Sequence, residues 1–241
     1  MKARGISTSG LLVVACGAVL SGSSTATIIL NQIGDVDAYD FEAAGPTPSQ
    51  RFPDFASYDC AVLEDFSVDS AQRRITNVSA LFQAQGGFVS FQGISGYFVD
   101  VFTDVNLAGA SLTGDVINME VYPGSGASVT QVIDPGGNNE YGLVSLDVDI
   151  LLPAAGNYWI SVEPVASLAT GQFYLANSGA TGAVTPGNAN AEFANPAEGF
   201  ANGKLSDTGA DYAYAITAVP EPAVVALWAV GSFAWLCRRR G

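Results

Sequence analysis

The sequence contains no histidine among its 241 residues. Catalysis by a Ser-His-Asp or Cys-His arrangement is therefore excluded, and so are zinc and iron sites that need histidine ligands. Cysteine is scarce as well, because the three cysteines stand far apart at positions 16, 60 and 237. This spacing excludes a cysteine-ligated metal cluster.

Basic residues are also few, since 9 Lys and Arg stand against 23 Asp and Glu, for a net charge of −14. Binding to nucleic acid through phosphates needs clustered basic residues, so this balance argues against a nucleic-acid partner. The basic residues are concentrated at the ends, at Lys2, Arg4 and Arg238–Arg240, whereas every acidic residue lies between Asp35 and Glu221.

Charged residues make up only 13% of the chain, while hydrophobic residues make up 49%. Disordered chains are usually poor in hydrophobic residues, so this composition indicates a packed core. The length suits one domain with additional end segments. With 27 Gly and 11 Pro, the chain has little room for long helices and favours a turn-rich fold.

The N-terminus, residues 1–26, has the three parts of a secretory signal peptide. Lys2 and Arg4 supply a positive start, Leu11–Leu20 is apolar, and Ser24-Thr25-Ala26 offers small residues for cleavage after Ala26. Two alternatives remain open. Val13 to Cys16 loosely matches a lipobox that would lipidate Cys16, and the segment could instead be a buried N-terminal helix.

The C-terminus, residues 219–241, combines three features in a fixed order. Pro220-Glu221-Pro222 precedes an apolar run over Ala223–Cys237, and Arg238, Arg239 and Arg240 follow it. As a helix the 15-residue run would be about 22 Å long, which is short for a membrane span of ~30 Å. We nevertheless predict a transmembrane helix, with the arginines in the cytoplasm and the body of the protein outside.

This tail resembles the PEP-CTERM sorting signal of Gram-negative bacteria, in which a Pro-Glu-Pro motif, a hydrophobic helix and a basic cluster follow one another. The motif is matched by Pro220, Glu221 and Pro222 as they stand. The resemblance implies processing by an exosortase after export, and delivery from an inner-membrane-anchored precursor to the cell surface or an exopolysaccharide matrix. It concerns sorting and says almost nothing about the cargo.

The segment between the two ends, residues 27–218, is predicted to be an all-β domain. Short stretches with a two-residue hydrophobic period recur between turn signals. The expected strands are 26–30, 61–68, 74–83, 88–91, 96–105, 116–122, 129–133, 143–152, 157–164, 172–176 and 212–218. A long acidic loop is expected after the first strand, and another loop over 177–204.

Strands with one polar face each favour an antiparallel two-sheet sandwich such as a jelly roll. Within 157–164, for example, Tyr158, Ile160 and Val162 should share a face opposite Trp159 and Glu163. Segments of the domain also resemble secreted bacterial β-sandwich proteins with interchangeable C-terminal anchors. The segments that carry this likeness are 64–68, 74–78, 158–162 and 211–216.

Two candidate binding sites emerge from residue types. Asp35, Asp37, Asp40 and Glu42 lie within eight residues and supply the hard oxygen ligands that calcium prefers, although a solvated acidic loop explains them as well. Trp159 with Glu163 is a candidate carbohydrate platform, and the ordinary alternative is that Trp159 packs under a loop or lies on the other face.

Cys60 is the one cysteine outside the two ends, and it is either a buried small hydrophobe or a thiol that pairs between chains.

The sequence therefore predicts an exported, non-enzymatic surface or matrix protein associated with exopolysaccharide, whose partners are the export machinery and an exosortase. A carbohydrate-binding module and a secreted glycan hydrolase of sandwich fold are the two alternatives.

Overall fold

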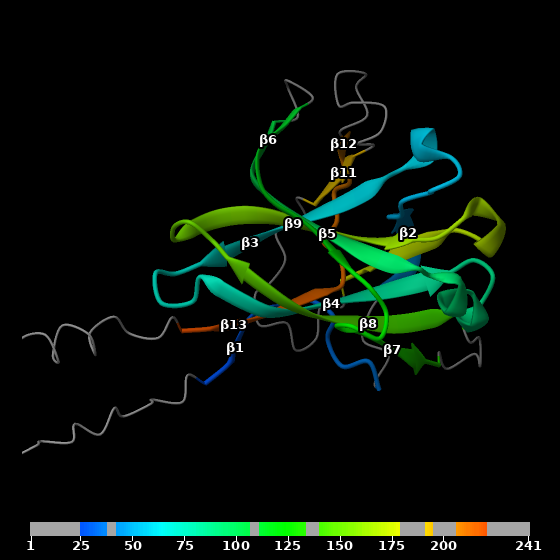
Figure 1. Ribbon diagram of the computed structural model, residues 1–241, viewed down its shortest axis with the longest axis horizontal. Helices are drawn as coiled ribbons and strands as arrows, with labels where there is room; N and C mark the ends of the chain where they lie inside the picture. The colour runs from blue at the N-terminus through cyan, green and yellow to red at the C-terminus, as the bar shows by residue number, and fades with distance from the viewer. Residues whose placement is uncertain are drawn as a thin grey trace, which may run out of the picture. The chain divides into compact units, whose positions relative to one another are not determined.

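A computed structural model describes residues 25–37, 42–106, 111–133, 140–178, 191–194 and 206–220. These residues belong to one compact unit that runs from Ser24 to Glu221. Figure 1 shows two antiparallel sheets, with β3, β9 and β5 above β4 and β8. The all-β sandwich predicted from the alternating hydrophobic pattern is therefore confirmed.

One sheet has seven strands, of which β4 is the centre because it pairs with β8, β13 and β10. The edges are formed by β1 beside β13, β2 beside β10, and β7 beside β8. Its strands are β1 (Thr27–Asn31), β2 (Glu42–Pro48), β4 (Arg74–Ala84), β7 (Ala127–Val132), β8 (Tyr141–Leu151), β10 (Phe173–Asn177) and β13 (Tyr214–Val219).

The other sheet has six strands in the order β12-β11-β3-β9-β5-β6. Its strands are β3 (Ala61–Val68), β5 (Gly96–Asn106), β6 (Ser111–Val121), β9 (Gly156–Val165), β11 (Glu192–Ala194) and β12 (Ser206–Asp207). Three short 3-10 helices lie in the connections: η1 (Ala56–Tyr58), η2 (Phe88–Gly93) and η3 (Leu168–Thr170).

The core lies between the sheets and is built from the apolar face of each strand. Tyr158, Ile160 and Val162 all belong to it, as the alternation within 157–164 predicts. A smaller cluster around Leu81 packs Ile33, Val132, Tyr141, Ala176 and Ala213. Leu81 alternates along β4 with the core residues Ala80 and Phe82, so this second cluster covers the outer face of the seven-stranded sheet.

One predicted strand is wrong, because residues 88–91 form part of the 3-10 helix η2. Phe88 and Phe91 are three residues apart, a spacing that places them on one face of a 3-10 helix. Their ring centroids lie 5.4 Å apart, and Phe91 also packs against Phe173 at 5.1 Å. Gly142 permits this packing, since a Cβ there would lie 2.7 Å from the Phe91 ring.

Two segments predicted to be loops contain strands. The first contains β2, which ends in Pro46-Thr47-Pro48. Among the described residues β2 pairs with β10 alone, and prolines are tolerated in such an edge strand. The second contains the three-residue β11, which pairs with β3 and carries too few residues to show a periodic pattern.

The first and last strands of the sandwich are neighbours, because β1 and β13 pair with Thr27 opposite Ala218. No helix among the described residues is long and apolar enough to cross a membrane. The predicted signal helix and the predicted C-terminal helix over 223–237 lie outside the described residues.

Candidate functional site

A buried cluster of charged side chains lies on the outer face of the six-stranded sheet. Arg51 donates from Nε to Glu163 Oε2 at 2.6 Å and also pairs with Asp100. Glu163 and Asp100 come from the neighbouring strands β9 and β5, where Phe98 is paired with Glu163 and Asp100 with Ser161. The Arg51 guanidinium lies 3.9 Å from the centre of the Phe98 ring, which adds a cation–π contact.

The charges of this cluster are unequal, since one guanidinium faces two carboxylates. Burial alone would lower the pKa of Arg51, but Glu163 and Asp100 raise it above its ordinary value. Glu163 is completely buried, and burial raises its pKa although Arg51 and the Ser161 hydroxyl favour its charged form. The cluster is thus a cation that is paired with two acids at once.

The short segment that carries Arg51 is held along the end of β9 by backbone bonds. Arg51 N–H donates to the Pro164 carbonyl at 3.0 Å, and Ala166 N–H donates to the Arg51 carbonyl at 3.1 Å. The Ser49 hydroxyl donates to the Val162 carbonyl at 2.9 Å. These bonds and the ion pairs of Arg51 hold the segment over the end of β9.

Cys60 lies at the base of the same segment, where it pairs with Gln50 in an isolated β-bridge. It is a free cysteine and is buried. Burial raises the pKa of its thiol to about 12, so the thiolate form is scarce at neutral pH. This environment agrees with the interpretation of Cys60 as a small buried hydrophobe.

The candidate carbohydrate residues Trp159 and Glu163 share the outer face of β9 but have different surroundings. Trp159 is half-buried and pairs across the sheet with Phe102 on one side and Asp65 on the other. The Glu163 carboxylate is already bound by Arg51 and Ser161 and does not reach the surface. Carbohydrate binding by Trp159 stays a prediction, and Glu163 serves the charged cluster instead.

A second buried acid, Glu64 on β3, was not singled out by the sequence analysis. It points into the core between the sheets, where its Oε2 accepts the Tyr212 N–H at 2.9 Å. Burial raises the pKa of Glu64 to about 9, because the Tyr212 N–H and the Gln32 side chain, which favour the charged form, do not offset it. The sequence carried a signal, since Glu64 alternates in phase with Val62, Phe66 and Val68, which all face the core.

The predicted calcium ligands lie partly outside the described residues. Asp35 and Asp37 are exposed, and Asp35 Oδ1 accepts the Asp37 N–H at 3.0 Å in a local turn. Asp40 is outside the described residues, and of Glu42 only the backbone is described, as the first residue of β2. Within the part of the chain that the structure describes, no three acidic or cysteine side chains group as metal ligands. The calcium hypothesis stays a prediction.

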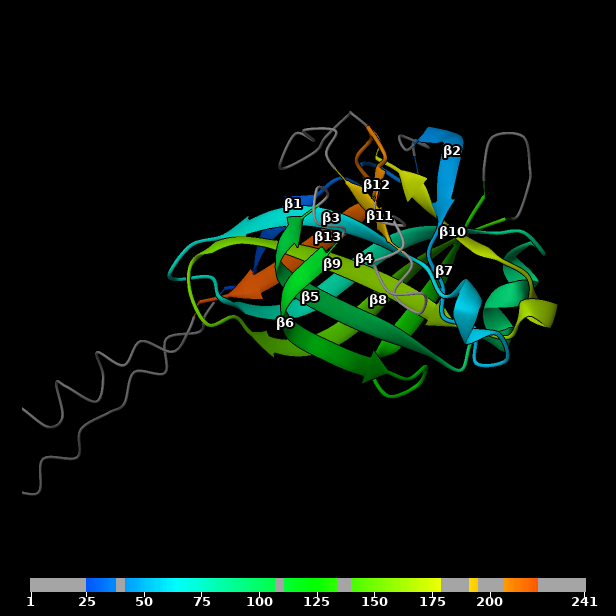
Figure 2. The ribbon, with the colours of Figure 1, turned by 90° about the horizontal axis from the view of Figure 1, so that it is seen from above.

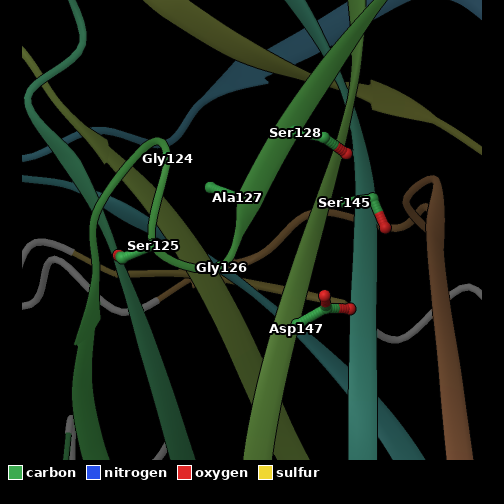
Figure 3. A pocket seen from close by; sticks show the side chains of 7 residues that line it. All are labelled: Gly124, Ser125, Gly126, Ala127, Ser128, Ser145 and Asp147. Carbon is green, nitrogen blue, oxygen red and sulfur yellow. The ribbon is translucent and has the colours of Figure 1, made fainter.

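A shallow hollow of about 300 Å³ lies where the turn between β6 and β7 meets β8 (Figure 3). It is lined by Gly124, Ser125, Gly126, Ala127, Ser128, Ser145 and Asp147. Two of its polar groups have partners, since Asn77 Nδ2 donates to Ser145 Oγ at 3.0 Å and to Asp147 Oδ1 at 3.1 Å. The lining of the hollow presents serine hydroxyls and one carboxylate.

The predicted sorting motif begins where the described residues end. Pro220 follows β13 directly and is half-buried, whereas Glu221, Pro222 and Arg238–Arg240 lie outside the described residues. No protein-family model matches this chain, and no curated protein matches it. Its function must therefore be argued from its own residues.

Proposed function

We propose that this chain is an exported, non-enzymatic protein of the cell surface or extracellular matrix of a Gram-negative bacterium, sorted by an exosortase through its C-terminal tail. The observation that carries the proposal is the pairing of the first and last strands. Because Thr27 lies opposite Ala218, the sandwich is closed between the predicted signal peptide and the Pro-Glu-Pro motif. Cleavage of both ends would leave every strand pair of the described residues intact.

The strand order supports a jelly roll as the architecture of the cargo. Four strands of one sheet run in the order β2-β10-β4-β8 and four of the other in the order β3-β9-β5-β6, and the chain crosses repeatedly between the two sheets. This order matches the double Greek key arrangement of jelly rolls, a fold found in viral capsid and lectin domains. The remaining strands extend the edges of the two sheets.

A non-enzymatic role is supported by the state of the two acids whose pKa values are raised by deep burial. Glu64 and Glu163 are both 0% exposed, and each is hydrogen-bonded within the fold. A catalytic acid must be able to touch its substrate. These carboxyls therefore serve the fold.

The acidic surface fits an extracellular setting. With a net charge of −14 the protein stays soluble and repels anionic surfaces, whereas hydrated neutral glycans carry no charge that would oppose contact. Association with a matrix polysaccharide is therefore the role we propose for the displayed domain.

Intact mass of the protein recovered from the surface fraction of its host tests this proposal. We expect a species that begins near Thr27 and ends near the Pro-Glu-Pro motif. A species that retains Arg238–Arg240 would mean permanent anchoring and would overturn exosortase sorting.

A variant pair makes this test specific for the motif. Replacement of Pro220 and Glu221 by Ala should leave the uncut precursor in the inner membrane. A Pro153→Ala variant, which changes an exposed turn between β8 and β9, is the matched control and should mature normally. Normal maturation of the motif variant would also contradict the proposal.

A further inference from the structure

The three 3-10 helices gather at the end of the sandwich remote from the start of β1 and the end of β13, as Figures 1 and 2 both show. Contacts join the three loops into one surface. The Asp54 carboxylate, just before η1, accepts the Leu168 N–H of η3 at 3.2 Å. The Thr170 side chain lies so close to Gly93 of η2 that a Cβ there would meet it at 2.6 Å.

Two aromatic rings stand exposed on this surface. Phe55 is 48% exposed and Tyr58 is 60% exposed, although both side chains are large enough to fill a core position. Their centroids are 6.1 Å apart and their planes meet at 75°, so the rings form an open corner. Paired exposed aromatics at one point of a surface are a common sign of a binding site.

The loop that carries the two rings is fixed by its own hydrogen bonds. Phe52 is buried, and its N–H donates to Asp59 Oδ1 at 2.6 Å across the base of the loop. Within the loop, Phe55 N–H donates to the Phe52 carbonyl at 3.0 Å, and Tyr58 N–H donates to the Phe55 carbonyl at 2.8 Å. The rings are therefore presented on an ordered backbone, which lowers the entropy lost on binding.

The groups around the rings point to the chemistry of the occupant. Asp54 and Ser57 are exposed beside them and offer a carboxylate and a hydroxyl. The stretch from Pro53 to Tyr58 contains no Lys or Arg, and the chain is strongly acidic. Aromatic faces with polar acceptors beside them suit a sugar ring, whose C–H face is apolar and whose rim carries hydroxyls. The negative charge excludes an anionic glycan or an anionic membrane as the preferred occupant.

We infer that the corner formed by Phe55 and Tyr58 binds a neutral polysaccharide, with the rings stacked on sugar faces and Asp54 and Ser57 accepting hydroxyl hydrogen bonds. The inference deepens the proposed function, since it supplies the contact with matrix polysaccharide that the proposed function assumes. It also moves carbohydrate recognition from Trp159, on the sheet, to the loops at the end of the sandwich.

Affinity electrophoresis of the purified full chain through gels containing soluble neutral glucans or mannan tests the inference. The detergent must lack a sugar head group, because such a head group would compete for the site. We expect retardation by at least one neutral glycan, and a loss of affinity of about tenfold or more in the Phe55→Ala/Tyr58→Ala double variant. The aromatic replacement Phe55→Trp should retain binding.

Two control variants distinguish binding at Phe55 and Tyr58 from nonspecific apolar contact and from binding at Trp159. Leu151→Ala removes an equally exposed apolar side chain (53% exposed) from the end of β8, and Trp159→Ala removes the aromatic residue predicted from the sequence. Both should bind like the unmodified chain, with folding checked by thermal melting. Loss of binding only in Trp159→Ala would overturn the inference.

Three further outcomes would also overturn it: no retardation by any neutral glycan, binding to vesicles of anionic lipid that the double variant loses, or self-association that the double variant abolishes. Failure of sorting in the host does not affect this assay, because the assay uses purified protein. Conversely, a failed assay leaves the sorting proposal standing.

Discussion

Two buried glutamates, Glu64 and Glu163, differ in their surroundings, because only Glu163 has a cation beside it among the described residues. Glu163, on the outer face of the six-stranded sheet, is bound by the Arg51 guanidinium. Glu64, between the two sheets, receives one backbone N–H and is described with no ion pair. Among the described residues its Oε1 has no hydrogen-bond partner, and burial raises its pKa to about 9.

The contrast shows two ways of placing an acid in a sandwich. Arg51 is paired with the Glu163 carboxylate. Removal of the Arg51 guanidinium would leave the negative charge of this buried carboxylate uncompensated. Without a cation, Glu64 is accommodated by keeping its proton, because burial disfavours the charged form. The stability of the region around Glu163 therefore depends on Arg51, whereas the stability of the region around Glu64 depends on pH.

The largest expected effect is that of Arg51→Ala. This variant leaves Glu163 and Asp100 together without their counter-charge, and breaking a buried pair in this way costs about 3–5 kcal/mol. Urea titration of the full chain measures the loss in the free energy of unfolding. Recovery of most of this loss in the triple variant that also carries Glu163→Gln and Asp100→Asn would confirm the charge imbalance as the cause.

The second prediction concerns the pH dependence that Glu64 creates. Its pKa is about 9 in the folded state against 4.5 for an exposed glutamate, so between these values only the folded state holds the proton. Stability should therefore fall as pH rises through this window, by an amount on the order of a few kcal/mol.

The isosteric variant Glu64→Gln isolates this effect, since it keeps the shape and cannot titrate. Its free energy of unfolding, measured by urea titration between pH 5 and pH 9, should change less with pH than that of the unmodified chain. Equal pH dependence of the two proteins would show that Glu64 is charged in the fold.

A third prediction uses Cys60 as a reporter of the Arg51 region. In the folded chain its buried thiol should resist alkylation at pH 8, whereas the unfolded chain should react rapidly. Arg51→Ala should increase the labelling rate because the segment over β9 loses its clamp, and Glu64→Gln should not. Peptide mapping separates Cys60 from Cys16 and Cys237. Equal protection in both variants would contradict the clamp.

The smallest effect is expected for the exposed ion pair between Arg74 and Asp149. Their separation is 2.6 Å, but the side chains are 41% and 66% exposed. Exposed pairs contribute about 0.2–1 kcal/mol, so Arg74→Ala should change the free energy of unfolding by no more than this. If Arg74→Ala lowered the free energy of unfolding as much as Arg51→Ala, burial would not explain the difference expected between the exposed and the buried ion pairs.

Much of the sandwich was predictable because half-buried strands show a two-residue hydrophobic period in the sequence. The strand 61–68 was placed with the observed bounds, and the predicted faces of 157–164 were correct. The strand predicted at 88–91 was wrong because four apolar residues are too few to distinguish a strand from a 3-10 turn. The strand β2 was missed because its prolines are acceptable only at a sheet edge, and edges depend on pairing.

The candidate sites were less predictable, for a different reason. Strand alternation places Trp159 and Glu163 on one face, and this alone made them a candidate site. It could not reveal that Arg51, 112 residues earlier, binds Glu163. The aromatic corner was missed because the sequence around Phe55 and Tyr58 resembles any polar loop with two aromatics. Their exposure depends on how Phe52 and Asp59 fix the loop.

The all-β class, the apolar end segments with their basic residues around an acidic domain, and the absence of histidine chemistry could all be predicted, because they follow from composition and local period. Which acids are buried, which cation pairs with them and which aromatic side chains stay exposed all depend on tertiary packing. Local patterns act over a few residues, whereas burial is set by strands that meet across the two sheets, such as β3 with β9 and β1 with β13.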